Sequence, residues 1–394
     1  MFRNYVYDAR NARHSFEIHN VDLSIVNGLR RVILTDIPMV GFRGEGEPTI
    51  RILKNNGPLH NEFMTHRIGM IPICLTEEEV EGFYENKYLF SLDVTNRDSK
   101  LLNVTTWDIT GTVREREPTD PTEPTEPIDA AEPAAPEKFI ERKATQEELR
   151  RWFPANRLTK EPILITRLRP GESLSFEAWP VKSTAREHAA FSPVSLCTHS
   201  YMMDEVAVAE GNITHVLQKE RTFIKNKYGD PIAFKFDLEC ETDLSPKYIF
   251  KRAMDILVER IDRIVNELSN EPSEIVRRDW CDKVPGYEFT VEKEDDTVGH
   301  LLQSTMFDAH VRKEEPLNGR TLTYSGYICP HPLDLKMVFR MVLKADTDTE
   351  ADAETVTDAD TYVSAFLQHC GAVKETLANL QTEWQAFADA SIRA

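Results

Sequence analysis

The sequence of 394 residues lacks the short motifs that mark most enzymes. It contains no GxxxxGK[ST] phosphate loop, no GxSxG or HExxH motif, and no DFDGD-like run of aspartates that could hold catalytic magnesium. Its six cysteines form no CxxC pair, which suits reduced thiols in a cytosolic or nuclear compartment. No apolar run approaches the length of a membrane span, and the first residues lack the apolar segment of a secretory signal. We therefore expect no catalytic residues in this chain and no membrane partner.

Positive charge is also scarce, because the formal net charge is −19. Such an acidic surface repels phosphate backbones, so contact with DNA is expected only indirectly. Many of the acids gather in two segments. Residues 114–139 form a Pro/Glu/Thr tract that we expect to be a solvated, disordered insertion. Residues 345–360 are predicted to be an acidic loop that leads into a helix.

The stretch VDLSIVNGLRRVILTDIP, residues 21–38, predicts an amphipathic helix. Its apolar residues recur at a spacing of three and four, and Asp22 can cap its start. Gly28 lies in mid-helix, where glycine costs about 1 kcal/mol relative to alanine. Arg30 and Arg31 follow it. A helix with only a structural role requires neither a glycine in its middle nor two adjacent arginines.

Two parts of the sequence share one plan of a short capped helix, strands and a long helix. In the first part the strand-like run IAFKFDLECET precedes a helix capped by Ser245, with an apolar heptad seam from Phe250 to Leu268. In the second part, the final helix carries a similarly narrow stripe from Val363 to Phe387. Between the short helix and the strands of the first part, Pro170-Gly171 predicts a hairpin over residues 163–179.

These helix faces suggest two modules that pair within one chain. The polar linker 271–286 can span roughly 50 Å when extended, enough to bring the second module beside the first. An amphipathic helix that packs only on its own sheet explains the spacing of the last helix equally well. The residues predicted to form the intramolecular interface are Val26, Leu29, Ile33, Phe250, Leu257, Ile261, Ile264, Leu301, Leu302, Val363, Phe366, Val373 and Leu377.

Candidate reactive residues are few. Cys197 with His199 and Cys329 with His331 resemble metal pairs, but their spacing favours buried thiols and surface imidazoles. Glu187 and His188 could act as a base and its orienting group, although adjacent side chains point apart. The run LHNEFMTHRIGMIPI is helix-like up to Pro72 and contains four further polar candidates: His60, Glu62, His66 and Arg67.

Six ordered blocks carry a resemblance to a known family. NVDLSIVNGLRRVILTDIPMVGF, LHNEFMTHRIGMIPI, VTTWDI and KSTAREHAAFSPVSL resemble the third-largest subunit of eukaryotic RNA polymerase II and its archaeal counterpart. EKEDDTVGHLLQSTMFDAHV and YSGYICPHPLDLKMVFRMV are similar to the eleventh subunit, its small partner. A fusion of the two resembles the arrangement in large nucleocytoplasmic DNA viruses, which implies viral transcription in host cytoplasm, a viral factory or the nucleus, with possible packaging in the virion.

The resemblance implies an α+β fold with two dimerisation modules like those of the bacterial alpha subunit. Residues 1–41 and 196–270 would form the first module, 42–195 an inserted, mainly β domain, and 287–394 the second module. It further implies a non-catalytic platform that binds the largest, second-largest and small platform subunits and forms no homodimer. A free-standing homodimeric transcription regulator and an enzyme built around His60, His66 and His188 are the alternatives.

The resemblance also implies which residues contact the large subunits. They are Asn27, Arg30, Arg31, His60, Glu62, His66, Arg67, Glu187, His188, Phe191 and Pro193. A solvated arginine pair is the competing interpretation of Arg30 and Arg31. Many family members bind zinc or an iron–sulfur cluster through cysteines of the inserted domain, whereas this sequence has Cys74 alone there. We therefore expect no metal cofactor.

Overall fold

The computed structural model describes most of the chain and divides it into two compact units. The described residues are 1–116, 139–240, 242–270, 276–280, 286–331, 333–344 and 359–392. Unit 1 comprises residues 1–37, 193–241 and 245–394, and unit 2 comprises residues 38–192 and 242–244. The sheets of more than two strands are antiparallel throughout, so the predicted mixed α+β class is confirmed.

Unit 1 contains two sheets of four strands. The first has the order β1-β2-β13-β12, with β1 Phe2–Asp8, β2 Arg13–His19, β13 Ala233–Cys240 and β12 Val194–Tyr201. The second has the order β14-β15-β17-β16, with β14 Val276–Trp280, β15 Tyr287–Glu292, β17 Lys336–Leu343 and β16 Leu322–Ile328. Phe16 lies opposite Phe236 in the first sheet, and Phe289 lies opposite Phe339 in the second.

Each sheet of unit 1 is accompanied by one shorter and one longer helix. These are α1 Leu23–Thr35 and α7 Pro246–Ser269 with the first sheet, and α8 Asp296–Met306 and α9 Ala359–Ser391 with the second. The single-turn η3 Phe307–Arg312 continues α8, and α5 Glu205–Glu210 and α6 Val216–Arg221 lie between β12 and β13. The predicted caps are present, because Asp22 accepts from Ser24 N and Ser245 accepts from Tyr248 N.

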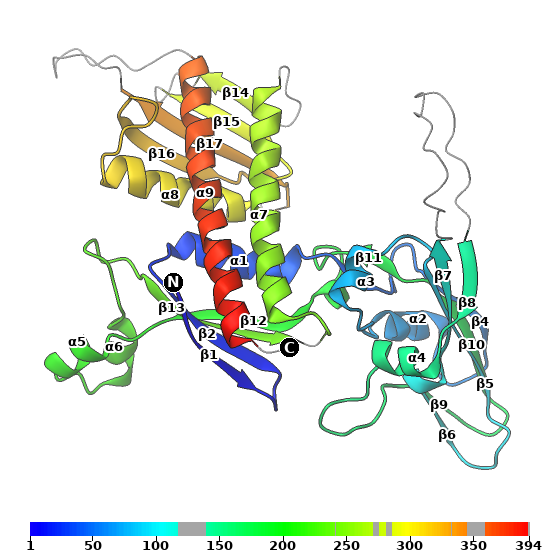
Figure 1. Ribbon diagram of the computed structural model, residues 1–394. Coiled ribbons are helices and arrows are strands. Elements are labelled where there is room, and N and C mark those ends of the chain that lie inside the picture. The colour runs from blue at the N-terminus through cyan, green and yellow to red at the C-terminus, as the bar shows by residue number, and fades with distance from the viewer. Residues whose placement is uncertain are drawn as a thin grey trace, which may run out of the picture. The chain divides into compact units, whose positions relative to one another are not determined.

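The long helices α7 and α9 lie side by side and antiparallel (Figure 1). Gln381 donates to Asp255 at 2.7 Å, and the indole of Trp384 donates to the carbonyl of Lys247 at 3.1 Å. Because Trp384 also lies 4.5 Å from the ring of Phe250, the end of α9 packs with α7. Its beginning packs on the other sheet, where Phe366 stacks on Phe289 at 4.8 Å. One helix therefore connects the cores of both sheets.

Unit 2 is mainly β. Its five-stranded sheet has the order β4-β10-β5-β7-β8, with β4 Ile50–Asn55, β10 Ser173–Ala178, β5 Tyr88–Thr95, β7 Thr110–Arg116 and β8 Phe139–Lys143. Two further strand pairs are described in this unit, β3 Met39–Gly41 with β11 Val181–Ser183 and β6 Leu102–Thr105 with β9 Leu164–Leu168. Its described α-helices are α2 Asn61–Gly69, α3 Glu77–Glu81 and α4 Gln146–Trp152. The short 3-10 helices are η1 Thr106–Asp108 and η2 Ala189–Phe191. Phe90 is central, with the rings of Phe42, Trp152 and Phe153 within 5.8 Å.

The predicted hairpin at residues 163–179 is wrong. The turn forms as expected, since Gly171 has a φ of +83° and Glu172 N donates to the carbonyl of Arg169 at 3.0 Å. However, β9 pairs with β6, whereas β10 pairs with β4 and β5. The turn therefore connects two different sheets. The strands that pair with β9 and β10, namely β6, β4 and β5, all precede the turn in the sequence.

Two predicted connecting segments also differ from the structure. The linker 271–286 contains strand β14, which pairs with β15 and extends the second sheet. In the acidic tract, residues 114–116 and Phe139 belong to the paired strands β7 and β8. The rest of that tract and residues 345–358 lie outside the described residues.

Candidate functional site

The arginine pair of α1 is held by neighbouring side chains. Arg31 donates through Nε to the hydroxyl of Thr297 on α8 at 2.9 Å. Arg30 donates through Nε to the side chain of Asn27 at 3.1 Å. Both residues are half-buried, and each guanidinium group has a hydrogen-bond partner, so neither is a freely solvated charge. The contact of Arg31 joins the part of unit 1 that precedes the linker to the part that follows it.

A polar hollow of about 170 Å³ opens between α1 and α8 beside Arg31. Burial and the nearby carboxylate of Asp296 raise the pKa of Tyr327 to about 12 and that of Cys329 to about 11. Both groups are therefore neutral at pH 7, whereas Arg31 and Asp296 bring charges of opposite sign to the hollow. Its lining residues are Ser24, Asn27, Gly28, Arg31, Asp296, Thr297, His300 and Tyr327.

Gly28 of α1 faces α7 and α8 without being crowded by them. A Cβ built at this position would lie 3.8 Å from Thr297 Cγ2 and 3.9 Å from Leu257 Cδ1. These are ordinary van der Waals distances, so the approach of α7 and α8 does not require glycine. The contacts within this chain therefore do not explain why a glycine stands here.

The two cysteine–histidine pairs do not resemble metal sites. Cys197 is buried on β12, and burial raises the pKa of its thiol. Burial and the charge of Arg30 lower the pKa of His199, whose ring packs at 6.0 Å from Phe234. Among the described residues, neither pair belongs to a group of three or more His, Cys, Asp or Glu side chains whose ligand atoms lie close enough to share a metal ion.

A buried ion-pair cluster, which the sequence analysis missed, lies where α1, α7 and α8 meet. The guanidinium group of Arg260 on α7 contacts Asp36 at 2.9 Å, Asp295 at 2.9 Å and Glu294 at 2.5 Å. Arg263 contacts the other carboxylate oxygen of Glu294, whose side chain is 0% exposed. Burial alone would lower the pKa of Arg260, but the carboxylates of Glu294 and Asp295 raise it. The cluster joins residues that precede the linker to residues that follow it.

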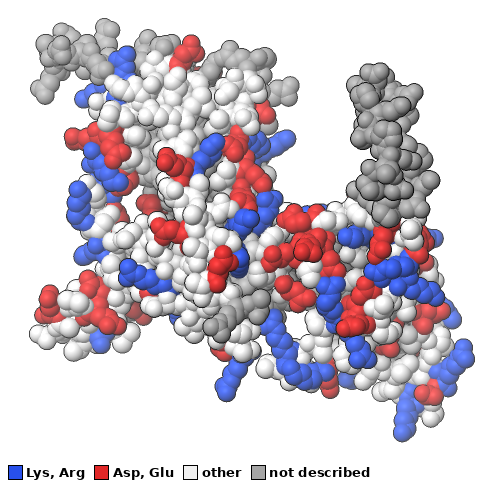
Figure 2. All heavy atoms as spheres, viewed as in Figure 1, with Lys and Arg blue, Asp and Glu red and all other residues white. Residues whose placement is uncertain are grey.

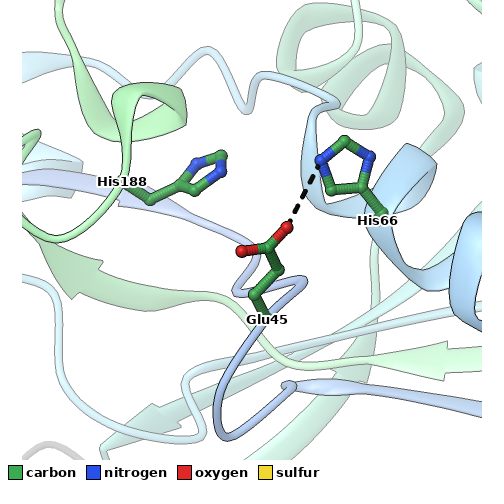
Figure 3. A group of neighbouring side chains, drawn as sticks. All are labelled: Glu45, His66 and His188. Carbon is green, nitrogen blue, oxygen red and sulfur yellow. Dashed lines mark ion pairs between the residues drawn. The ribbon is translucent and has the colours of Figure 1, made fainter.

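A second polar cluster lies in unit 2 between η2, α2 and the loop after β3. Figure 3 shows the carboxylate of Glu45 between the rings of His66 and His188, with an ion pair to His66 at 3.7 Å. The ligand atoms of these three residues lie within 4.8 Å of one another. Glu45 and His66 are exposed and His188 is half-buried.

The backbone explains why Glu45 reaches His66. A Cβ at Gly69 would lie only 2.8 Å from Gly44 Cα, so the loop after β3 rests directly on the last turn of α2. The geometry favours polar recognition over metal binding. His188 Nδ1 accepts from Ala190 N at 3.1 Å, so the neutral ring carries its proton on Nε2 and has no lone pair there.

Several residues predicted to contact a partner have contacts within the chain or are buried. Arg67 donates to the carbonyls of Ile165 and Leu164 at 2.7 and 2.8 Å, and Glu187 accepts from Arg43 and Ser183. Phe191 is 1% exposed and packs against Gly41, and Pro193 is buried. By contrast, His60 and Glu62 are exposed on α2. Phe191 and Pro193 are thus buried within the free chain, and their contact with a large subunit stays a prediction.

The residues predicted for the internal helix interface lie on α1, α7, α8 and α9. α1 packs on α7 and α8, and α7 packs on α9. Val363 is half-buried, because the first turn of α9 turns Tyr362 inward instead. The other predicted residues are buried: Val26, Leu29, Ile33, Phe250, Leu257, Ile261, Ile264, Leu301, Leu302, Phe366, Val373 and Leu377.

Cys74 does not fit the metal site that the resemblance associates with the inserted segment. It is the one cysteine of residues 42–195, it is buried, and its backbone N donates to the carbonyl of Trp152. One buried thiol cannot supply the set of ligands that zinc requires.

Comparison with known proteins identifies the family. The sequence pattern of the RNA polymerase Rpb3/Rpb11 dimerisation domain matches residues 15–261. The chain belongs to this family. Within the part of the chain that the structure describes, no helix is long and apolar enough to cross a membrane.

Several curated relatives are named as polymerase subunits. The chain is 24% identical to "DNA-directed RNA polymerases I and III subunit rpac1" of Dictyostelium discoideum, over 65% of this chain and 79% of that protein. It is 24% identical to "DNA-directed RNA polymerases II, IV and V subunit 3" of Arabidopsis thaliana, over 57% and 69% of the two chains. It is 25% identical to subunit RPAC1 of Saccharomyces cerevisiae, over 49% of this chain and 54% of that protein.

Proposed function

We propose that this chain is a non-catalytic assembly subunit of a multisubunit DNA-directed RNA polymerase, on which the two large catalytic subunits assemble. The family match supports this role, as do relatives whose names identify them as polymerase subunits. The free-standing regulator is not favoured, since these relatives belong to polymerases. For the enzyme alternative, the residues that line the hollow beside His188 include no serine, threonine or cysteine that a histidine could activate.

We also propose that residues 287–394 take the place of the small partner subunit, so that dimerisation occurs within one chain. The observation that carries this proposal is the packing of α1 and α7 against α8 and α9 in unit 1, closed by the buried cluster of Arg260 and Glu294. Covalent linkage gives the two parts an effective concentration of order millimolar, so a second copy is not required.

Cleavage of the linker tests this pairing. A protease site at residues 271–275 should yield two pieces that remain together on sizing. Leu257→Asp should separate them, because Leu257 is 0% exposed and an unpaired carboxylate is costly to bury. A stable homodimer of the intact chain, or separation of the pieces without any mutation, would contradict the proposal.

The surfaces for the large subunits are proposed on α1, beside the hollow that it shares with α8, and on unit 2. Asn27, Arg30 and Arg31 form the first, and His60, Glu62, His66 and His188 form the second. If a partner desolvates Arg30 and Arg31, removing these side chains should weaken its binding free energy by about 2–5 kcal/mol.

Reconstitution with the two large subunits tests the function itself. Arg30→Ala with Arg31→Ala should weaken capture of the second-largest subunit while the chain stays folded. Arg157→Ala with Lys160→Ala, a pair of exposed charges, is the matched control and should assemble normally. If wild-type chain captures neither large subunit, the proposed function fails. If the wild-type chain assembles and the double variant at α1 assembles equally well, the proposed surface on α1 fails while the proposed function stands.

The viral source remains a proposal that rests on the fused arrangement. If the source is viral, we propose that the chain acts in host cytoplasm, a viral factory or the nucleus. Packaging of the chain in the virion is a further proposal. Detection of the chain by mass spectrometry in purified particles and in infected-cell fractions would decide between these locations.

A further inference from the structure

The excursion between β12 and β13 has helices but no core of its own. Residues 203–223, all of which the structure describes, include α5 and α6, and none of their side chains is buried. We call this segment the α5–α6 lobe. Helices of six residues are unstable in water unless they pack against something, because nucleation costs more than a few hydrogen bonds return.

The base of the lobe is nevertheless well fastened to the first sheet of unit 1. Met203 and Phe223 form an antiparallel bridge, and Asp204 N donates to the carbonyl of Thr222 at 2.9 Å. The ring of Tyr201 lies 5.0 Å from that of Phe223. The lobe is therefore presented from a fixed base.

The lobe exposes large apolar side chains. Val206 and Val216 are each 66% exposed, Leu217 is 58% exposed and Met203 is 43% exposed. Single exposed apolar residues need no explanation, but four within one short excursion that lacks a core are typical of a binding surface.

The charge of the lobe indicates the chemistry of its partner. Four acidic residues in the lobe outnumber two basic ones, Lys219 and Arg221, which lie in the last turn of α6. The acidic charge is concentrated at α5, where Asp204 caps the helix and Glu205 and Glu210 are its first and last residues, with no basic residue in between. Figure 2 shows acidic side chains gathered over this part of unit 1. An anionic rim disfavours a nucleic acid backbone or an anionic lipid surface and is complementary to lysine and arginine.

We infer that the α5–α6 lobe is a docking element for a protein that presents an apolar groove bordered by basic side chains. This inference rests on the proposed function, because it takes that protein to be another subunit of the same polymerase. The lobe is separate in sequence from α1 and from the polar cluster of unit 2. Docking would bury the apolar side chains and supply the packing that the two helices lack.

Hydrogen exchange in the assembled polymerase tests the inference. Amides of residues 205–221 should exchange quickly in the free chain and at least tenfold more slowly in the reconstituted complex. Leu217→Asp should reduce retention of one subunit at least tenfold, and the control Leu333→Asp, at an 84% exposed leucine outside the lobe, should not. Glu205→Lys with Glu210→Lys should weaken the same contact, most strongly at low salt.

The outcomes separate the two proposals. If the wild-type chain does not enter a polymerase, the proposed function fails. If it enters but the lobe stays unprotected and Leu217→Asp is retained normally, the docking inference is overturned. Protection that appears in the free chain and rises with its concentration would assign the lobe to self-association and would also overturn the inference.

Discussion

Removing the carboxylate of Glu294 should loosen the contact between the two parts of unit 1. Arg260 would keep Asp36 and Asp295 in Glu294→Gln, but Arg263 would lose the charged oxygen that it contacts. Breaking a buried ion pair by removing one partner costs about 3–5 kcal/mol, because it leaves an uncompensated charge. Since two carboxylates remain beside Arg260 and glutamine keeps a polar group in place, we expect the lower end, about 3 kcal/mol.

The assay uses the chain cut at residues 271–275. A loss of about 3 kcal/mol corresponds to roughly a hundredfold weaker association of the pieces, since about 1.4 kcal/mol is a factor of ten. Glu259→Gln on the same helix is the control, because Glu259 is 59% exposed in its pair with Arg252 and such pairs contribute at most about 1 kcal/mol. The effect of Glu294→Gln should also depend little on salt. If both variants change association by less than threefold, the buried cluster does not hold the parts together.

Two further predictions concern acid stability and helix contacts. Burial lowers the pKa of His369 in the folded chain to about 3, whereas its ordinary value is about 6.5. Between these two pH values the unfolded chain binds a proton at His369 and the folded chain does not. The free energy of unfolding should therefore fall as pH drops from about 6.5 towards 3. Urea unfolding at pH 7 and pH 4.5 should show that His369→Gln loses about 2–3 kcal/mol less of this free energy than wild type over the interval. Equal losses in the two proteins would refute the prediction. Gly69→Ala should destabilise unit 2 in thermal unfolding, because its Cβ would meet the backbone of Gly44, whereas Gly28→Ala should be neutral or stabilise by up to about 1 kcal/mol. The opposite order would show that Gly28 is the glycine that packing requires.

Local patterns were sufficient to predict the principal helices of unit 1. The caps at Asp22 and Ser245 and the heptad seam of α7 are properties of neighbouring residues, and the structure confirms them. Periodicity also identified buried faces, since twelve of the thirteen residues predicted for the internal interface are buried. It failed at Val363 because the first turn of α9 packs on the second sheet, which a spacing pattern cannot specify.

The candidate sites needed the tertiary structure. The sequence drew attention to Arg30, Arg31 and the histidines of α2, but it could not indicate that Arg31 bonds to Thr297 or that Arg67 bonds to the carbonyls of β9. A residue type shows what a side chain can donate or accept, and its partner depends on which distant segment folds against it.

By itself, then, the sequence determined where unit 1's main helices begin, which faces they bury and which family the blocks resemble, because those signals depend on neighbouring residues. Only the tertiary structure decided that β9 and β10 join different sheets, that the linker supplies β14, and that Asp36, Arg260 and Glu294 meet. Asp36 and Arg260 are 224 positions apart, and no local rule relates them. Their contact exists because α1, α7 and α8 pack together, and the low exposure of the site makes it energetically important.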